Sequence, residues 1–327
     1  MKPLVTVLVV TYNHVNTFEE AIKSVLAQKT NFDFKIWVLD DASTDGSTEL
    51  VRKYAELYPD KIVPIIRPQN LGGIQNVFQA LQRIDTKYFA TLESDDYWCD
   101  ENKLQRQVDI LENNPDCSFC CHNSYRRYPN NESCSKHNTP YIRTKIKSGK
   151  YHFPKKLCRK QYIEQHYSSR MYRTECLNLD KLKNPVMVCY DIASMFWFLS
   201  FGKMYYDDRI MSVYNFSYSG VYSGADCKTQ NYMSANIISQ INQGFDYKYN
   251  SMFLDFFKKK IPVSFAKTIY IKYFAPKGEL EKIYNNLLEI YMKPMNDRIN
   301  SKTLFKFAIP IGNKKRVCLE IRREKEM

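Results

Sequence analysis

Two hydrophobic periods alternate along the first 120 residues of this chain, and this alternation constrains the fold more than any other feature. Short apolar runs of strand length are separated by segments whose apolar residues recur at helical spacing, such as Ala21, Ile22 and Val25. Strands that alternate with helices through short connections predict an α/β fold with a mostly parallel, doubly wound sheet. The expected strands are residues 4–10, 35–39, 62–66, 88–92 and 118–121, and the expected helices are residues 18–28, 48–58, 74–83 and 103–113.

Polar residues follow the first four of these strands. Ligands of doubly wound sheets bind beyond the carboxyl ends of the strands, so we expect one composite site at this edge. The residues at the four strand ends are Thr11, Tyr12 and Asn13; Asp40 and Asp41; Asn70, Gly72 and Gly73; and Glu93, Ser94, Asp95 and Asp96.

The acidic residues after the fourth strand are the strongest chemical signal. Glu93, Asp95 and Asp96 repel one another unless a positive charge lies between them, and a hard divalent cation with carboxylate and phosphate ligands supplies it. The chain has neither a Gly-x-Gly-x-x-Gly turn after its first strand nor a Gly-Lys-Ser/Thr phosphate loop. We therefore expect a metal on Asp95 and Asp96 to hold a diphosphate. The alternative is that one of these residues caps the helix expected near Asn102.

Two further segments are candidates for ligand contact. The carboxylate of Asp41 is able to accept a hydrogen bond from a base N–H or a ribose hydroxyl. The same stretch also suits a turn, with Asp45 capping the next helix. Asn70 and Gly72 precede a helix expected from Ile74, whose N-terminus favours anionic groups. An ordinary turn into a helix explains that segment equally well.

The net charge of +13 is unevenly distributed. Residues 1–121 are acidic, whereas residues 122–190 and 251–327 are strongly basic. This predicts an anionic partner for the later segments, although a solvated, lysine-rich surface gives the same composition. Aromatic residues interleave with lysines over residues 253–274, which suits either an anionic membrane surface or a packed amphipathic helix. No nucleic-acid-binding module is recognisable, so we expect no nucleic-acid partner.

The cysteines indicate a reducing cellular compartment rather than a metal site. The ten cysteines form no disulfide framework, which is typical of a reducing cytosol. Cys117, Cys120, Cys121 and His122 lie close together, but a buried strand explains this stretch better than a metal site. No window approaches 18 apolar residues. We expect a cytoplasmic protein, with a peripheral position at the inner face of the cell membrane left open.

Four motifs follow one another along the chain: Val5-Thr-Val-Leu-Val-Val-Thr-Tyr-Asn, Asp40-Asp-Ala-Ser-Thr-Asp-Gly-Ser, Asn70-Leu-Gly-Gly and Glu93-Ser-Asp-Asp. In this order and spacing they resemble glycosyltransferase family 2, whose members are inverting bacterial sugar transferases of the GT-A fold. The resemblance covers residues 4–124 and resumes over residues 185–223. It therefore implies a GT-A-like sheet with flanking helices.

The resemblance also implies roles for single residues. Tyr12 and Asp41 would contact the uracil or ribose of a UDP-sugar, Asp95 would contact ribose and metal, and Asp96 would bind Mg²⁺ or Mn²⁺. The role of Glu93 stays open. The full set of expected nucleotide-sugar-binding residues is Thr11, Tyr12, Asn13, Asp41, Asn70, Gly72, Ser94 and Asp95.

Asp191 resembles the acid that opens an apolar helix near the acceptor in this family. It is the single acid in the apolar run over residues 185–202, so we expect it to be partly desolvated, with a raised proton affinity. The implied role is that of a base for the acceptor hydroxyl. The alternative is an N-cap for the same helix.

The chain departs from the family pattern after the strand expected over residues 203–216. The family commonly has an arginine, and a histidine two residues later, where this chain has Asn215 and Ser217. If that histidine holds metal or diphosphate, the contact is missing here. Lys228 and Arg173 are possible substitutes.

These observations predict a GT-A catalytic domain over residues 1–224 and a basic helical C-terminal region over residues 225–327. Within the first, residues 1–121 would form the nucleotide-binding half and residues 122–224 the acceptor half. The expected activity moves a sugar from UDP-hexose or UDP-N-acetylhexosamine to a hydroxyl of a cell-surface glycan or glycolipid precursor. The alternatives are a sugar-phosphate nucleotidyltransferase and a scaffold that binds a sugar nucleotide or polyanion without turnover.

Overall fold

The computed structural model describes residues 2–128, 138–140, 146–152, 165–182, 184–217, 237, 240–241, 243–246, 248, 305–311 and 315–321. The chain divides into two compact units. The first contains Met1–Lys155 and Arg159–Met233, and the second contains Lys156–Cys158 and Ser234–Met327. The predicted division into residues 1–224 and 225–327 stays a prediction.

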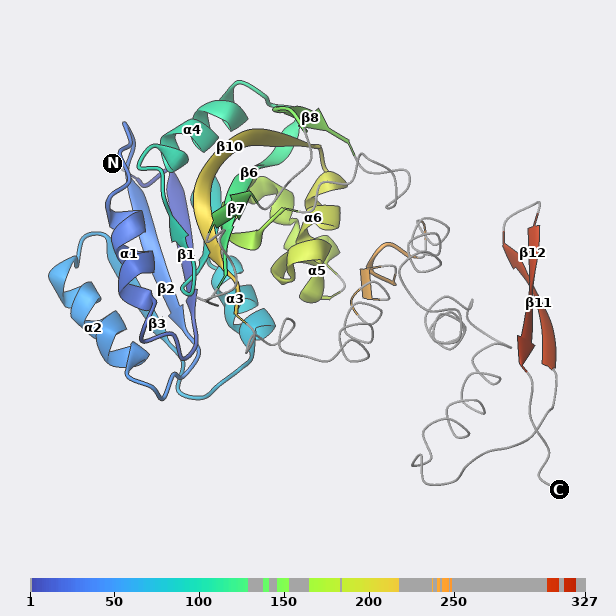
Figure 1. Ribbon diagram of the computed structural model, residues 1–327, viewed down its shortest axis with the longest axis horizontal. Coiled ribbons are helices and arrows are strands. Elements are labelled where there is room, and N and C mark those ends of the chain that lie inside the picture. Colours follow the sequence, from blue (N-terminus) through green and yellow to red (C-terminus); the bar gives the residue numbers. More distant parts are fainter. Residues whose placement is uncertain are drawn as a thin grey trace. The chain divides into compact units, whose positions relative to one another are not determined.

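One large mixed sheet forms the first unit (Figure 1). Its strand order is β3-β2-β1-β4-β9-β6-β10-β5, with β7 beside β6 and β8 beside β10. The strands β1 to β4 are parallel, and β1 is buried almost throughout, which explains its continuous apolar run. These strands are β1 (Val5–Thr11), β2 (Phe34–Asp40), β3 (Ile62–Ile66) and β4 (Tyr88–Glu93).

Helices cover both faces of the parallel strands, as the predicted doubly wound fold requires. The helices α1 and α2 lie on one face and α3 lies on the other (Figure 1). The helix α1 buries Phe18, Ala21, Ile22 and Val25, so its apolar residues do form one face. The helices are α1 (Phe18–Leu26), α2 (Ser47–Leu57), α3 (Gly73–Leu81) and α4 (Lys103–Glu112), each within two residues of its predicted bounds.

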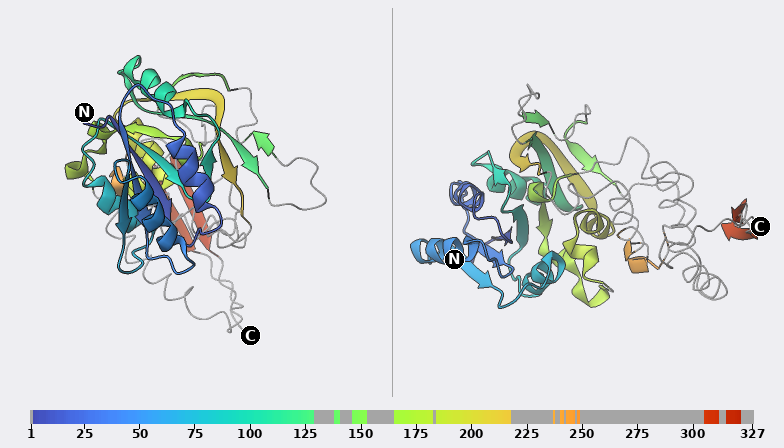
Figure 2. Two further views of the ribbon diagram at one scale, coloured as in Figure 1. Left: turned by 90° about the vertical axis from the view of Figure 1, so that its left-hand side faces the viewer. Right: turned by 60° about the horizontal axis from the view of Figure 1, so that its bottom comes forward.

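The other half of the sheet mixes strand directions. The strand β10 is parallel to β6, and β9 lies antiparallel between β4 and β6. A register shift between Asp207 and Ile210 interrupts β10, and the strand is strongly curved (Figure 2). The elements are β5 (Tyr97–Trp98), β6 (Cys117–Arg127), β7 (Asn138–Pro140), β8 (Gly149–Tyr151), β9 (Met171–Arg173), β10 (Lys203–Asn215), the 3₁₀ helices η1 (Tyr167–Ser169), η2 (Thr174–Leu177) and η3 (Leu179–Lys181), and the helices α5 (Val186–Cys189) and α6 (Asp191–Leu199).

The strand β6 confirms one prediction and corrects another. Cys117, Cys120 and His122 are buried within it, so this stretch is a core strand, as expected. However, β6 continues to Arg127, whereas the expected strand ends at residue 121. Pairing with β10 explains the extension, because partners for the polar residues of β6 come from a strand some 90 residues away.

The described part of the second unit contains an antiparallel hairpin of β11 (Phe305–Ile311) and β12 (Lys315–Ile321). The basic region over residues 225–327 was expected to be helical, which is wrong for these two segments. The local signal for strands is the alternation in Phe305-Lys-Phe-Ala-Ile-Pro-Ile. The aromatic and basic segment over residues 253–274 lies outside the described residues. Among the described residues, none of the helices combines the length and the hydrophobicity that a membrane span requires.

Candidate functional site

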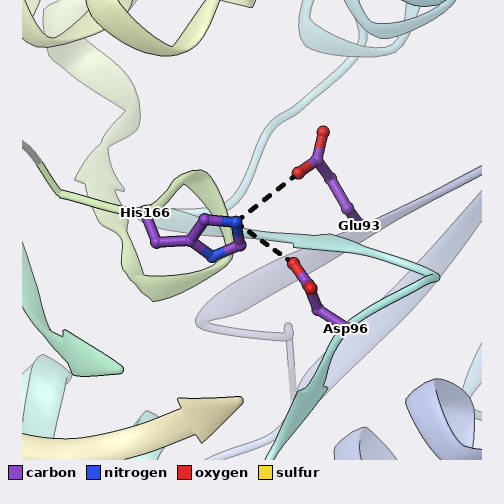
Figure 3. Close-up of side chains that lie close together, drawn as sticks. All are labelled: Glu93, Asp96 and His166. Carbon is purple, nitrogen blue, oxygen red and sulfur yellow. Dashed lines mark ion pairs between the residues drawn. The ribbon is translucent and has the colours of Figure 1, made fainter. Parts of the chain in front are cut away.

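Two acids from the end of β4 and a histidine from a distant segment form the centre of the candidate site (Figure 3). The His166 Nε2 atom lies 3.4 Å from a carboxylate oxygen of Asp96 and 3.9 Å from one of Glu93. One ligand atom from each residue lies within 4.8 Å of the other two. Two carboxylates and an imidazole at this spacing form a set that could hold a divalent cation.

Neighbouring groups fix Asp96 from both sides. Ser168 Oγ donates a hydrogen bond of 2.6 Å to Asp96 Oδ2, and the backbone N–H of Asn215 donates one of 3.0 Å to Oδ1. Ser168 Oγ also accepts a hydrogen bond from the backbone N–H of Glu93. The side-chain amide of Asn215 donates to the carbonyl oxygen of Asp95. The acidic loop is therefore held by η1 on one side and by the end of β10 on the other.

The charges at this site are unfavourable without a cation. Burial, and then the negative charges of Asp95 and Glu93, raise the pKa of Asp96 well above its usual value. Burial, followed by the charges of Asp95 and Asp191, raises the pKa of Glu93 to about 8. Solvent reaches 46 % of the Glu93 side chain, which moderates that effect. A bound cation would relieve the repulsion among these acids.

The imidazole of His166 is neutral in this setting. Burial, and then the positive charge of Arg170, lower the pKa of His166 to about 3. The neutral form is the one that binds a metal ion. Its ring also packs against the ring of Tyr214, with the two centroids 4.3 Å apart.

The residues predicted at the ends of β1 and β2 lie together. Asn13 adopts a left-handed conformation with φ of 56°, and its side-chain oxygen accepts a hydrogen bond from the backbone N–H of Thr44. Thr11 is buried, whereas 44 % of Tyr12 is exposed. Asp41 is buried, and its Oδ1 atom accepts a hydrogen bond of 2.8 Å from the backbone N–H of Leu71. This last bond joins two segments that were predicted separately as ligand contacts.

The remaining predicted residues line the same edge. Ser94 is buried, and its Oγ atom lies 2.8 Å from Nδ1 of His14. The Asn70 side chain accepts a hydrogen bond from the N–H of Gly72, which has φ of 79° and precedes α3. The segment therefore forms the expected turn into a helix, and its position at the edge also leaves the proposed ligand contact open.

The structure decides two of the alternative explanations. The helix α4 begins at Lys103 with Asn102 as its N-cap, so neither Asp95 nor Asp96 caps it. Asp45 accepts hydrogen bonds from the backbone N–H and hydroxyl of Ser47, as a turn residue would, but the N-cap of α2 is Gly46 rather than Asp45.

Asp191 is the first residue of α6, and Tyr190 is its N-cap. Its negative charge contributes to the raised pKa of Glu93, so the two carboxylates act on the same region. Arg170 donates a hydrogen bond to the carbonyl oxygen of Asp191 and thereby fixes the start of the helix. The expectation that Asp191 is partly desolvated is wrong for this structure, because the residue is exposed while the apolar part of α6 is buried behind it.

A model of the family described as glycosyl transferase family 2 matches residues 6–189, more than half of the chain. The chain belongs to glycosyltransferase family 2. An uncharacterized protein of Mycobacterium tuberculosis is 35% identical over 117 residues, which cover 36% of this chain and 34% of that relative. The match thus spans about a third of the relative's length.

Two solved structures share the GT-A fold of this family 2 chain. TarS of S. aureus in complex with UDP-GlcNAc has a TM-score of 0.55 at 16% identity, over 88% of this chain and 76% of that one. The mannosyltransferase PcManGT from Pyrobaculum calidifontis, in complex with GDP-Man and Mn²⁺, has a TM-score of 0.51 at 14% identity, over 90% and 81%. At these identities, the likeness establishes the fold alone.

His166 and Ser168 of this family 2 protein were not among the site residues expected from the sequence. Neither residue stands in a periodic segment, and nothing near them marks a ligand site. Arg173 was a possible substitute for the absent family histidine, but its guanidinium donates to the carbonyl oxygens of Cys117 and Leu111, away from the acids. The other possible substitute, Lys228, lies outside the described residues.

A surface hollow of about 770 Å³ lies elsewhere on this family 2 domain. It is lined by residues such as Leu26, Phe34 and Tyr58, near the start of β2. Ligands of doubly wound sheets bind at the opposite edge, and the perturbed acids lie there too. We therefore place the site at the acids.

Proposed function

We propose that this protein is an inverting, metal-dependent glycosyltransferase. It moves one sugar from a nucleotide donor, UDP-hexose or UDP-N-acetylhexosamine, to a hydroxyl of a cell-surface glycan precursor. The observation that carries the proposal is the cluster of Glu93, Asp96 and His166 at the ligand-binding edge of a family 2 sheet. The complexes of TarS with UDP-GlcNAc and of PcManGT with GDP-Man and Mn²⁺ support the classes of donor and cofactor.

Glu93, Asp96 and His166 would hold Mg²⁺ or Mn²⁺. The fit rests on the donor set, which has two carboxylates, a neutral imidazole and ligand atoms within 4.8 Å of one another. When bound, the ion would neutralise negative charge on the departing diphosphate. Asp95 stays a candidate for a second metal contact or for the ribose.

The donor nucleotide would lie beside the ends of β1, β2 and β3. The exposed ring of Tyr12 offers a surface for a nucleobase, and the Asp41 carboxylate has capacity for further hydrogen-bond donors. Asn13, Asn70 and Gly72 complete this wall. Thr11 and Ser94 are buried and would act by supporting the residues around them.

Asp191 would act as the base. The acceptor oxygen attacks the anomeric carbon and forms the new glycosidic bond, while the bond to the diphosphate oxygen breaks and the diphosphate leaves with the electron pair. The acceptor proton passes to the Asp191 carboxylate. Attack opposite the leaving group inverts the configuration. The exposure of Asp191 suits this role, because an acceptor must be able to reach it.

Donor hydrolysis tests this proposal without knowledge of the acceptor. We expect slow release of UDP from UDP-glucose, UDP-galactose or UDP-N-acetylglucosamine, stimulated by Mn²⁺. Asp96→Ala should abolish it, and Asp191→Asn should reduce it by roughly 10²–10⁴-fold. Asp109→Asn, on the exposed side of α4, is the matched control. Tight binding without turnover of any donor would favour the scaffold alternative.

A further inference from the structure

Arg170 is a charged side chain that lies inside the protein, between the end of η1 and the start of β9. Arginine keeps its charge when it is buried, because its pKa lies far above neutral pH. A buried charge is costly unless hydrogen bonds satisfy it. The acceptors that hold Arg170 therefore indicate what this residue does.

The guanidinium group of Arg170 reaches two separate segments of the candidate site. Its Nη2 atom donates a hydrogen bond of 2.7 Å to the carbonyl oxygen of Gln165, the residue before His166. Its Nη1 atom donates to the carbonyl oxygen of Asp191 and, at 3.1 Å, to Oγ of Ser194. One side chain thus connects the segment that carries the histidine with the start of α6.

At the first end of this connection, Arg170 holds the backbone that leads to His166. The carbonyl group of Gln165 lies in the same peptide plane as the N–H of His166, so a hydrogen bond to that oxygen fixes the plane. The Nε2 atom of His166 lies 3.4 Å from a carboxylate oxygen of Asp96 (Figure 3). Fixing the peptide plane therefore limits how far the imidazole can move from the acids.

At the second end, Arg170 holds the first turn of α6. The carboxylate of Asp191 accepts a hydrogen bond from the N–H of Ile192, so its orientation follows that turn. The hydroxyl of Ser194 donates a hydrogen bond of 3.0 Å to the Asp191 carbonyl oxygen and accepts one from Arg170. Because the Asp191 side chain is exposed, its backbone rather than a surrounding pocket sets its position.

A second buried arginine on β9 provides a comparison. Arg173 also donates hydrogen bonds to carbonyl oxygens, but these belong to Cys117 and Leu111, away from the acids. Two arginines three positions apart thus have the same kind of contact in the core. Of the two, Arg170 is the one that reaches the candidate site.

We propose that Arg170 is a positioning residue, which holds the proposed metal ligand His166 and the proposed base Asp191 in one fixed arrangement. Both groups must act on one donor molecule, and a misplacement of about 1 Å can cost about 100-fold in rate. Arginine suits this role because its planar group holds two acceptors at once, which the single ammonium of lysine does not. This inference rests on the proposed function and adds a residue to the same site.

Arg170→Lys tests the inference in the full chain, and the two ends of the connection give two readouts. The affinity for Mn²⁺, titrated by electron paramagnetic resonance, reports on the His166 end. The kcat of UDP-sugar hydrolysis at saturating Mn²⁺ reports on the Asp191 end. We expect both to fall by roughly 10–100-fold, with the KM for the donor nearly unchanged. Asp191→Asn should lower kcat and leave the affinity for Mn²⁺ unchanged.

Arg173→Lys is the matched control, because it makes the same change in a buried arginine of the same strand. It should lower the melting temperature and change neither readout. If Arg170→Lys does not fold, Ser194→Ala decides, since it removes one acceptor of Arg170 and one donor to the Asp191 carbonyl oxygen. Ser194→Ala should lower kcat relative to Ser200→Ala, at the other end of α6, and an unchanged kcat would overturn the inference.

Two further outcomes overturn the inference. One is that Arg170→Lys leaves either readout unchanged, because the connection requires an effect at both ends. The other is that Arg173→Lys lowers both readouts as much, since the loss then follows from a disturbed core. Failure of the unaltered protein to bind Mn²⁺ with UDP, or to hydrolyse any donor, would contradict the proposed function itself. Success of the unaltered protein together with an overturning outcome contradicts the positioning role alone.

Discussion

Asp96 shows how much a single side chain depends on its supports. Its two oxygens accept hydrogen bonds from Ser168 and from the backbone of Asn215, so its orientation is set before any cation arrives. Groups that orient a metal ligand in this way commonly contribute strongly to metal affinity. Ser168 is the clearer of the two to test, because its hydroxyl also accepts the N–H of Glu93.

Ser168→Ala should weaken Mn²⁺ binding by about 10–100-fold. The reason is that Asp96 loses a donor and the Glu93 N–H loses its acceptor within a buried site. Titration of Mn²⁺ by electron paramagnetic resonance measures the change directly. Ser200→Ala, which removes a hydroxyl bonded to Trp197 at the end of α6, is the control. If Ser168→Ala binds Mn²⁺ as tightly as the unaltered protein does, Ser168 does not support the metal site.

His122 should make the fold sensitive to acid. Burial, and then the charge of Lys103, lower its pKa from 6.5 to about 3, so the folded protein keeps this imidazole neutral while the unfolded chain protonates it. The contribution of His122 to the free energy of unfolding is therefore constant above pH 6.5. Below that pH this contribution falls, by up to about 1.4 kcal/mol per pH unit, until about pH 3.

His122→Gln should lessen the slope of unfolding free energy against pH between pH 6.5 and 5, as measured by urea denaturation. The remaining slope combines two opposed effects: the lowered pKa of His166 acts in the same direction as that of His122, and the raised pKa values of Glu93 and Asp96 act in the opposite direction. The exposed His152→Gln variant should keep the slope of the unaltered protein. The comparison uses the slope and not the absolute stability of His122→Gln. If this variant and the unaltered protein have equal slopes, His122 is not a source of the acid sensitivity.

At the scale of elements, Gly202 lies at the junction between α6 and β10 and has less room for a side chain than any other described glycine. A Cβ atom on Gly202 would lie 2.9 Å from the carbonyl oxygen of Asp116 and 3.0 Å from the backbone nitrogen of Ser118. Both neighbours belong to backbone, so neither moves easily.

Gly202→Ala should therefore lower the free energy of unfolding by about 1–3 kcal/mol. Gly73→Ala is the matched control, because Gly73 begins α3 and a Cβ there meets nothing within 4 Å. It should be neutral or stabilising by up to about 1 kcal/mol. Calorimetric melting of both variants checks the pair, and equal melting temperatures would show that β6 and β10 shift freely.

The parts of the fold that follow local rules could be predicted from the sequence. The strand Ile62–Ile66 has its predicted bounds, and the four helices after β1–β4 lie within two residues of theirs, because periodicity and turn residues are local signals. The acids of the site were found in the same way, since they stand directly at a strand end.

The rest of the site depends on pairing between distant segments. His166 and Ser168 reach the acids because the short strand β9 inserts antiparallel between β4 and β6. A strand of three residues has too few positions to show a period, so neither it nor its ligand could be predicted. The exposure of Asp191 was also missed, because desolvation depends on which residues α6 packs against rather than on its composition.

At the scale of the whole molecule, ligand binding should raise thermal stability. A cation and nucleotide that bind the folded state alone stabilise it according to their concentration relative to Kd, by about 2.7 kcal/mol at a hundredfold excess. Mn²⁺ with UDP should therefore raise the melting temperature. Asp96→Asn should abolish this shift while folding normally in the presence of a chelator. A shift that persists in Asp96→Asn would place the ion elsewhere.

The supports of Asp96 stand 72 and 119 residues away from it along the sequence. The proposed ion site therefore forms only once β9 and β10 have joined the sheet. A chain arrested earlier in folding would lack the hydrogen bonds from Ser168 and Asn215 that orient Asp96. Cation binding at the proposed site should therefore report that assembly of the sheet has finished, and an incompletely folded copy should not turn over the proposed donors.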